Sequence, residues 1–466
     1  MRLFTKSDAP DTTLGLVERT AYMSGKAGIS MINAVISTFL MFYYTDVMML
    51  NAGILGTLLL ISRVFDGVTD VVMGMVVDRT HSRHGKGRAW VLWTCIPYAV
   101  SGVLLVCVPG GATEMVQYIY VFITYNLCNS ICLTALYVPY NAMMVNMTTN
   151  PYERGLLGIF VMVGTTVSNL AVQNTIMKAT SALGGDQRAW QIVVGIYALI
   201  SLILSLFCFF FTKERTVDIK VGEVHKKVDI KLELSAVLKN KYWIIMIFVT
   251  FFALMFTSLF GTAGIYYAAG VLGDSEAFSS IVSAMTLSQL VFLFLAFIPM
   301  KKFGKRNTTL AGMALITLGC LIEIFLPATV AAATITGVVK GIGAGLAGAV
   351  MSGMVADTID YGEWKTGFKA EGIGVAATTV ATKVANGLAA VVVGWFLEFG
   401  QYDGAAAMQS QKAINALTGC FVWLPMVFGA IATVLLCFYN LDKIYPKIQK
   451  ELEQRRNNKE EAAEQG

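Results

Sequence analysis

The chain has little charge for its length. Lysine, arginine, aspartate and glutamate together make up 14% of the 466 residues, whereas 56% are hydrophobic and the mean hydropathy is +0.64. Soluble domains carry about a quarter charged residues, so this composition excludes a soluble globular protein. The sequence therefore predicts an all-α integral membrane protein, because a helix satisfies its own backbone hydrogen bonds inside lipid.

Histidine is scarce, and the motifs of catalysis are missing. The three histidines, His81, His84 and His225, all fall in polar connections. The apolar segments therefore lack a metal cluster or a nucleophile paired with a base, which makes a membrane enzyme a weak alternative. No phosphate-binding Gly-Lys-Ser/Thr loop occurs, which argues against an ATP-driven pump. We expect no enzyme activity, no organic cofactor, no nucleic-acid partner and no obligate protein partner.

Two further absences concern processing and redox chemistry. The eight cysteines all lie within apolar segments, where a thiol is ordinarily a small hydrophobic side chain, so no disulfide framework is expected. The first twenty residues are polar and lack an apolar core followed by a cleavage site, so we expect no cleaved signal peptide.

Twelve apolar segments are long enough to cross a bilayer. They cover residues 21–48, 52–78, 89–109, 114–146, 154–180, 188–212, 241–270, 276–300, 307–326, 328–358, 370–399 and 411–440. A short basic sequence, GKGR at Gly85–Arg88, recurs as GKRN at Gly304–Asn307, after the second helix of each set of six. We expect an N-terminal six-helix bundle over 1–212, a cytoplasmic central loop over 213–240, a C-terminal six-helix bundle over 241–440 and a cytoplasmic tail over 441–466. The tail ends in EEAAEQG, whose composition favours disorder.

Basic residues set the expected orientation. They gather in the connections after the second and eighth segments and in the tail, while the connections after the first, third, seventh and ninth have no lysine or arginine. Basic loops stay on the cytoplasmic side, so the net charge of +5 reflects topology, and both termini are expected in the cytoplasm. The expected location is the plasma membrane, here a bacterial inner membrane, with the lipid bilayer as surroundings.

Two carboxylates interrupt the second apolar segment. Asp66 and Asp70 are four residues apart, which places both on one helix face. Asp66 follows the start of its segment, at residue 52, by fourteen residues and precedes its end, at residue 78, by twelve, so it lies roughly 20 Å from either end. A carboxylate in hydrocarbon costs several kcal/mol. The pair should therefore face a protein cavity and hold a cation or a proton.

Five motifs in matching order resemble one family. They are YYTDV (Tyr43–Val47), RVFDGVTD (Arg63–Asp70), the RxGKxR pattern (Arg83–Arg88), VPY (Val138–Tyr140) and ADTIDYGEWKTG (Ala356–Gly367), the last followed by Glu371 and Lys383. This pattern resembles the glycoside-pentoside-hexuronide:cation symporters of the major facilitator superfamily, which include the melibiose and glucuronide permeases. The resemblance implies twelve transmembrane helices in two bundles and cation-coupled symport of a small solute by alternating access.

The resemblance also implies a cation site. It falls on Asp66, Asp70 and Thr134, with Lys383 beside it as a coupling residue and Arg63 as a second one. Two carboxylates and a hydroxyl are hard ligands that suit Na+, and either carboxylate can also carry a proton, so the coupling ion is Na+ or H+ and no other metal is expected. The alternative is structural, with Asp70 paired to Arg63 or to a basic loop residue.

The expected solute site departs from the family pattern. The two acids that hold sugar hydroxyls in the melibiose permease are replaced by Ala27, after Lys26, and by Tyr137. Their loss argues against a neutral galactoside and leaves room for a uronide, a sulfonated sugar or a solute that is not a sugar. The candidate solute-binding residues are Tyr137, Asn129, Asn141, Lys340 and Lys26, with Asn126 as a further amide. For Tyr137 and the three asparagines, polar contact between helices is an equal alternative. For Lys340, contact with an anionic solute and pairing with an acid remain equal alternatives.

A last group of charges lies at predicted cytoplasmic helix ends. It comprises Asp78, Arg79, Arg83, Asp357, Asp360, Glu363 and Lys365. Opposite charges at these positions favour an inner gate made of ion pairs, and the alternative is a set of solvated loop charges. An exporter of an amphiphile or drug with the same fold remains the alternative function, and a substrate-sensing receptor is a weaker one.

Overall fold

The computed structural model describes residues 9, 11–80, 82–215, 238–367, 371–406 and 408–464. Within these ranges, the side chains of Val64, Val71, Asp78, 371–379 and 456–464 are not described. Most of the predicted central loop, His81, His225 and the side chains of Asp78 and Glu371 therefore lie outside the described part of the chain.

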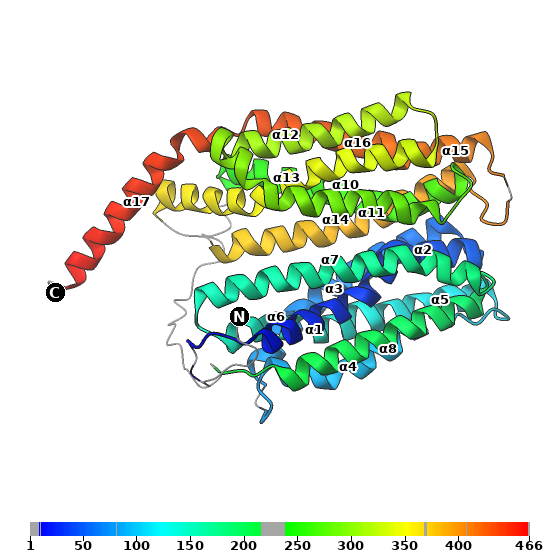
Figure 1. The fold of residues 1–466 in the computed structure, drawn as a ribbon, viewed down its shortest axis with the longest axis horizontal. Coiled ribbons are helices and arrows are strands. Elements are labelled where there is room, and N and C mark those ends of the chain that lie inside the picture. The colour runs from blue at the N-terminus through cyan, green and yellow to red at the C-terminus, as the bar shows by residue number, and fades with distance from the viewer. Residues whose placement is uncertain are drawn as a thin grey trace. The chain divides into compact units, whose positions relative to one another are not determined.

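The first half of the chain forms helices over its predicted spans, except that the third helix ends at Leu104 and not at residue 109 as predicted (Figure 1). Its elements are α1 (Leu16–Ala34), η1 (Val35–Phe39), α2 (Leu40–Phe42), η2 (Tyr43–Val47), α3 (Ala52–Asp78), α4 (Gly87–Leu104), α5 (Glu114–Tyr125), η3 (Asn126–Leu133), α6 (Thr134–Met147), α7 (Pro151–Ala182) and α8 (Gln187–Phe211). The η elements are π-helical turns inside longer helices. Short polar residues begin the helices: Asn51, Asn150 and Asp186 each accept a hydrogen bond from a backbone N–H in the following first turn.

The second half repeats this arrangement. Its elements are α10 (Lys241–Gly270), α11 (Ala277–Leu295), α12 (Phe297–Phe325), α13 (Val330–Thr366), α14 (Glu371–Gly400), α15 (Gln411–Thr418), η4 (Gly419–Trp423), α16 (Leu424–Cys437) and α17 (Leu441–Glu464). The predicted basic connection between the eighth and ninth spans is a kink inside α12, at Gly304 with φ 84° and ψ 169°. The expected disorder of the tail is wrong as far as Glu464, because α17 continues to that residue.

Ten helical stretches of the described residues are long and apolar enough to cross a membrane. The helices α3 and α4 are not among them, and α3 carries Arg63, Asp66 and Asp70 inside its span. With these two, the described residues contain the twelve membrane helices that the sequence predicts. Large apolar side chains such as Ile203, Phe210 and Phe294 are at least half exposed, as expected for helices that lipid surrounds.

The chain forms two compact units. Unit 1 comprises Met1–Gly222, Ile265–Ser279 and Ala390–Leu417, and unit 2 comprises Glu223–Gly264, Ser280–Ala389 and Thr418–Gly466. Unit 1 therefore contains the end of α10 and the end of α14 in addition to the first six membrane helices. The predicted division into bundles over 1–212 and 241–440 follows the connectivity of the chain, and it stays a proposal.

The two basic loop sequences perform the same task in their own units. In unit 1, Glu214 accepts hydrogen bonds from the backbone N–H groups of Lys86 (2.9 Å) and Arg88 (2.7 Å), and the Arg88 guanidinium donates to the Phe209 carbonyl near the end of α8. The basic loop is thereby fixed to the last helix of its set, with a cation at that helix's C-terminal end.

In unit 2, Asp442 accepts a hydrogen bond from the Arg306 N–H at 2.7 Å. The Arg306 guanidinium donates to the carbonyls of Leu436 and Cys437 at the end of α16. This parallel supports an internal repeat, which the short match of GKGR with GKRN predicted.

Candidate functional site

The two acids of α3 lie deep in the helix. The bounds Ala52–Asp78 are those predicted, and Asp66 is 3% exposed while Asp70 is half-buried. Both lie on the face that meets η3 and α6, since Asp66 bonds to a side chain of η3 and Asp70 to one of α6. A buried carboxylate is stable only when partners replace its lost water, so these partners define the site.

Three of the described side chains bond to Asp66. Its Oδ2 accepts hydrogen bonds from Asn129 Nδ2 at 2.8 Å and from the Arg63 guanidinium at 3.2 Å, and its Oδ1 accepts one from the Ser130 hydroxyl. The Arg63 contact is an ion pair one helical turn away along α3. The Arg63 Nε is buried and has no hydrogen-bond partner among the described residues, so the guanidinium uses only part of its hydrogen-bonding capacity.

A π-helical turn brings two consecutive residues onto the same carboxylate. Asn129 and Ser130 both belong to η3 and both bond to Asp66, one to each oxygen. In the same turn, Asn126 donates to the Ser62 hydroxyl at 2.9 Å. Single π-helical turns inside α-helices are frequent at functional sites, because the wider turn reorients side chains. Asn129 and Asn126 thus bond to side chains of α3, as expected for polar contacts between helices, and their role in solute binding stays a prediction.

Asp70 extends the cluster toward α6. Its Oδ1 accepts a hydrogen bond from the Thr134 hydroxyl at 3.0 Å, and Thr134 is 6% exposed. Asp66, Asp70 and Thr134, the three predicted cation ligands, therefore lie together in unit 1. Ser130 adds a second hydroxyl that sequence reasoning missed. Carboxylate and hydroxyl oxygens gathered in one cluster are the ligands that hard cations prefer.

Next to this cluster lies a lysine over an aromatic ring. The Lys26 Nζ is 4.1 Å from the centre of the Tyr137 ring, a distance at which cation–π attraction is significant. Tyr137 follows Thr134 by three residues on α6 and precedes Asn141 by four, so the three side chains share one helix face. Tyr137 is 39% exposed and Asn141 is also exposed, as residues that contact a solute must be.

The register of α1 against α6 is set by two tyrosines. The Tyr22 hydroxyl donates to the Tyr140 carbonyl at 3.1 Å, the Tyr140 hydroxyl donates to the Tyr22 carbonyl at 2.7 Å, and the rings stack with their centres 4.5 Å apart. Lys26 lies one turn after Tyr22, and Tyr137 lies one turn before Tyr140. The reciprocal tyrosine pair therefore positions the lysine over the ring.

Lys340 is not placed to meet a solute. It is 1% exposed inside unit 2, where its ammonium forms an ion pair with Glu323 and lies 5.0 Å from the centre of the Phe421 ring. This is the pairing with an acid that the sequence left open, and it corrects the assignment of Lys340 to the solute site. The physical reason is that a buried ammonium requires a carboxylate, and α12 supplies one.

Two of the predicted gate residues, Asp357 and Asp360, bond to neighbouring elements within unit 2. Asp357 accepts two hydrogen bonds from Lys305 Nζ at 2.8 and 2.6 Å, and Asp360 accepts one from the Tyr445 hydroxyl at 2.8 Å. Glu363 is half-buried, whereas Lys365, Arg79 and Arg83 are exposed. Lys305 and Tyr445 come from the basic sequence of α12 and from α17, so the acids of α13 hold both elements in place.

Lys383 lies on α14, is half-buried and belongs to unit 2, whereas the carboxylates of α3 belong to unit 1. Its predicted pairing with Asp66 or Asp70 therefore stays a prediction. Sequence reasoning also missed Glu323 and Glu214, although a carboxylate within an apolar helix, as at Glu323, is itself a signal that could have been followed.

Comparison with known proteins assigns the fold and the family. The family model described as MFS/sugar transport protein matches residues 21–443. An isoprimeverose transporter of Lactiplantibacillus pentosus is 32% identical, with 94% of this chain and 91% of the relative covered. A putative glycoside/cation symporter, YagG, of Escherichia coli strain K12 is 28% identical, with 92% and 93% covered.

A solved structure agrees with the fold. The crystal structure of a D-xylose–proton symporter matches with a TM-score of 0.64 at 15% identity, covering 91% of this chain and 97% of that one. The chain is a multi-pass membrane transporter and not an enzyme. It belongs to the MFS/sugar transport protein family.

Proposed function

We propose that this chain couples the movement of a glycoside or related sugar to that of a cation bound at Asp66 and Asp70. The observation that carries the proposal is the buried cluster in unit 1, where both carboxylates meet the oxygen-bearing side chains of Asn129, Ser130 and Thr134. Ionisable groups at this depth of a membrane helix are costly and mark ion pathways. The names of the symporter relatives support the same activity.

The chemistry of the cluster fits Na+ and H+. Both carboxylates supply charged oxygens, and the Ser130 and Thr134 hydroxyls supply lone pairs once they stop donating to those carboxylates. Arg63 is the resident counter-charge of Asp66, so a cation that enters takes over the role of Arg63. We infer that this exchange frees Arg63, and Lys383 is proposed to respond in the same way.

The proposed solute contacts lie on α1 and α6. Lys26 supplies a positive charge, Tyr137 an aromatic face with a hydroxyl, and Asn141 an amide. Since Lys340 is committed to Glu323, the attraction for a uronide or sulfonated sugar rests on Lys26. A relative named for isoprimeverose supports a saccharide as the transported solute.

We further propose an inner-membrane location with both termini in the cytoplasm, an inner gate that includes Asp357 and Asp360, and alternating access of two six-helix bundles. Export of an amphiphile is the weaker alternative, because the buried carboxylates favour coupling to an entering cation.

The test is solute uptake into vesicles that contain the purified protein. An imposed inward Na+ gradient and an imposed inward H+ gradient are compared with no gradient, using saccharides with and without an acidic group. Accumulation driven by one of the two gradients supports the proposal and names the ion. Uptake that only equilibrates the solute under every gradient contradicts it.

A further inference from the structure

A network of hydrogen bonds surrounds Asp46 in unit 1. The Tyr402 hydroxyl donates to Asp46 Oδ1 at 2.7 Å, and the Thr45 hydroxyl donates to Asp46 Oδ2 at 2.6 Å. The hydroxyls of Thr45 and Tyr266 are 2.8 Å apart. The Thr45 hydroxyl also lies 3.1 Å from the Met41 carbonyl, but the Asp46 carboxylate is its nearest and only charged acceptor among these contacts. With the Thr45 proton on Asp46, Tyr266 donates to Thr45, so Tyr266, Thr45 and Tyr402 all connect to the carboxylate.

These four residues come from three separate stretches of sequence. Thr45 and Asp46 belong to η2, Tyr266 to the end of α10, and Tyr402 to the connection after α14. Because α3 starts at Ala52 and extends 27 residues to Asp78, they lie about 40 Å along that helix from the basic loop of Arg83–Arg88. The hydrogen bonds therefore lie at the end of unit 1 that is remote from this loop.

The residues of this network are buried and closely packed. Thr45 is 6% exposed and Tyr266 is fully buried, and the rings of Tyr266 and Tyr402 meet edge to face with centres 5.5 Å apart. A side chain at Gly404 would come within 2.8 Å of the Asp46 Cα. Burial and the Asp46 carboxylate raise the pKa of Tyr402, so its hydroxyl remains a donor.

Backbone strain concentrates at the same place. Among the described residues, Met49 (φ 56°) and Gln401 (φ 55°) are the non-glycine residues with positive φ. Met49 follows Asp46 by three residues, and Gln401 directly precedes Tyr402. Strained backbone persists only where surrounding contacts hold it, and it is typical of segments that switch between two arrangements.

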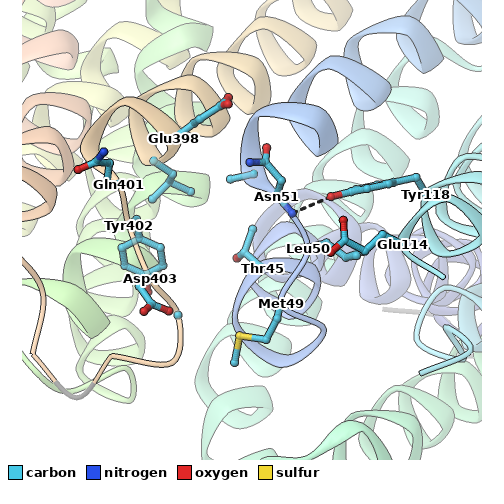
Figure 2. Close-up of a pocket in the computed structure, with 13 residues that line it drawn as sticks. Thr45, Met49, Leu50, Asn51, Glu114, Tyr118, Glu398, Gln401, Tyr402 and Asp403 are labelled. Atoms are coloured by element: carbon cyan, nitrogen blue, oxygen red, sulfur yellow. Dashed lines mark hydrogen bonds between the residues drawn. The ribbon is translucent and has the colours of Figure 1, made fainter. Parts of the chain in front are cut away.

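A polar cavity lies against this network (Figure 2). It has a volume of about 470 Å³ and is lined by both strained residues and by Asn51, Glu114, Glu398 and Asp403. Figure 2 shows Glu398, Gln401, Tyr402 and Asp403 on one side and Thr45, Met49, Asn51 and Glu114 on the other. The same cavity thus separates the two sets of segments that the hydrogen bonds join.

We propose that Asp46, Thr45, Tyr266 and Tyr402 form a latch that closes this end of the transport path, and that the latch parts to admit the solute through the polar cavity. The inference rests on the proposed transport function. Two hydrogen bonds cross between the segments, from Tyr402 to the Asp46 carboxylate and between Tyr266 and Thr45, and they hold the closed form against strain at Met49 and Gln401. Removing one charge-assisted bond therefore shifts the balance toward the open form.

The test measures access behind the latch without any ion gradient or solute. Thr38, 5% exposed, precedes Thr45 by seven residues and so lies deeper in the same helix than the latch. Thr38→Cys places a small thiol at this depth, in a background free of native cysteines. Intact cells are treated with a small impermeant thiol reagent from outside. Tyr402→Phe, which keeps the ring and removes the donor, is expected to raise the labelling rate of this cysteine about tenfold, and Thr45→Val is expected to do the same.

A matched control comes from the same cavity. The Tyr118 hydroxyl accepts a hydrogen bond from the Asn51 N–H at 2.9 Å and takes no part in the latch, so Tyr118→Phe should leave the rate unchanged. Equal rates in the parent, Tyr402→Phe and Thr45→Val would overturn the latch, and so would an equal increase in Tyr118→Phe. Gradient-driven uptake by the parent is measured separately, so a failed latch and a failed transport proposal give different results.

Discussion

Asp66 depends on residues that are remote from it in sequence. Its partners on η3 are more than sixty residues away, and only the Arg63 contact is local. The i, i+4 spacing of Asp66 and Asp70 could be read directly from the sequence, as could their depth in the helix. The Ser130 contact could not, because it depends on a π-helical turn that no apolar periodicity reveals.

The buried pair in unit 2 yields a prediction about stability. Lys340→Met should lower the free energy of unfolding by about 3–5 kcal/mol, because Glu323 would remain buried without its partner and its Oε1 already has none among the described residues. The double variant Lys340→Met with Glu323→Leu should recover much of this loss. The measurement is thermal denaturation of the purified variants, and a double variant as unstable as the single one would contradict the prediction.

Tyr137 is expected to contribute twice to solute binding. Tyr137→Phe keeps the ring beneath Lys26 and removes the hydroxyl, so affinity should fall by up to about tenfold, the effect of one neutral hydrogen bond. Tyr137→Leu also removes the cation–π contact and should weaken binding further. Dissociation constants from equilibrium binding decide the matter. Unchanged affinity in Tyr137→Leu would remove this residue from the solute site.

At the scale of elements, hydrophobic run length predicted the helix bounds well, as α3 and α10 show. The charged composition of the tail led to a wrong expectation of disorder, because α17 bonds to α13. Trp364 donates to Glu451 at 2.6 Å, and Tyr445 donates to Asp360. These partners lie about 85 residues apart in sequence, and local composition carries no information about them.

The kink in α12 should depend on glycine. Gly304 has φ 84° and ψ 169°, a conformation that is essentially confined to glycine, so Gly304→Ala should cost about 1–3 kcal/mol. On α13, Gly353 has open space around an added Cβ and a helical backbone, so Gly353→Ala should be neutral or slightly stabilising. Melting temperatures of the two variants are compared, and equal values would show that the kink is not held by Gly304.

For the whole molecule, loop charges predict which side each connection faces. A single cysteine at Gly111, where an added side chain meets open space, should react with an impermeant thiol reagent from outside. One at Tyr152, 71% exposed at the start of α7, should react only after the membrane is permeabilised. Gly404 is unsuitable as an outside position because it packs on Asp46. Labelling of Tyr152→Cys from outside would contradict the predicted topology.

The family and the twelve-helix fold were predictable because lipid imposes them on composition and segment length. The roles of individual charged residues were harder to predict. Lys340 and Lys383 look alike in sequence, because each is a lysine within an apolar helix. The structure places Glu323 beside Lys340, which the sequence had left with two alternatives. Side-chain pairing between helices is decided by packing, and the sequence pattern of one helix does not contain it.

The central claim is that the carboxylates of α3 couple solute movement to a cation. The most direct measurement compares solute accumulation with solute exchange in vesicles that contain the parent or Asp70→Asn. Asp70→Asn is cleaner than Asp66→Asn, since the latter also leaves Arg63 without its partner. The account predicts that Asp70→Asn abolishes accumulation under an ion gradient while exchange persists. Accumulation equal to that of the parent would contradict it.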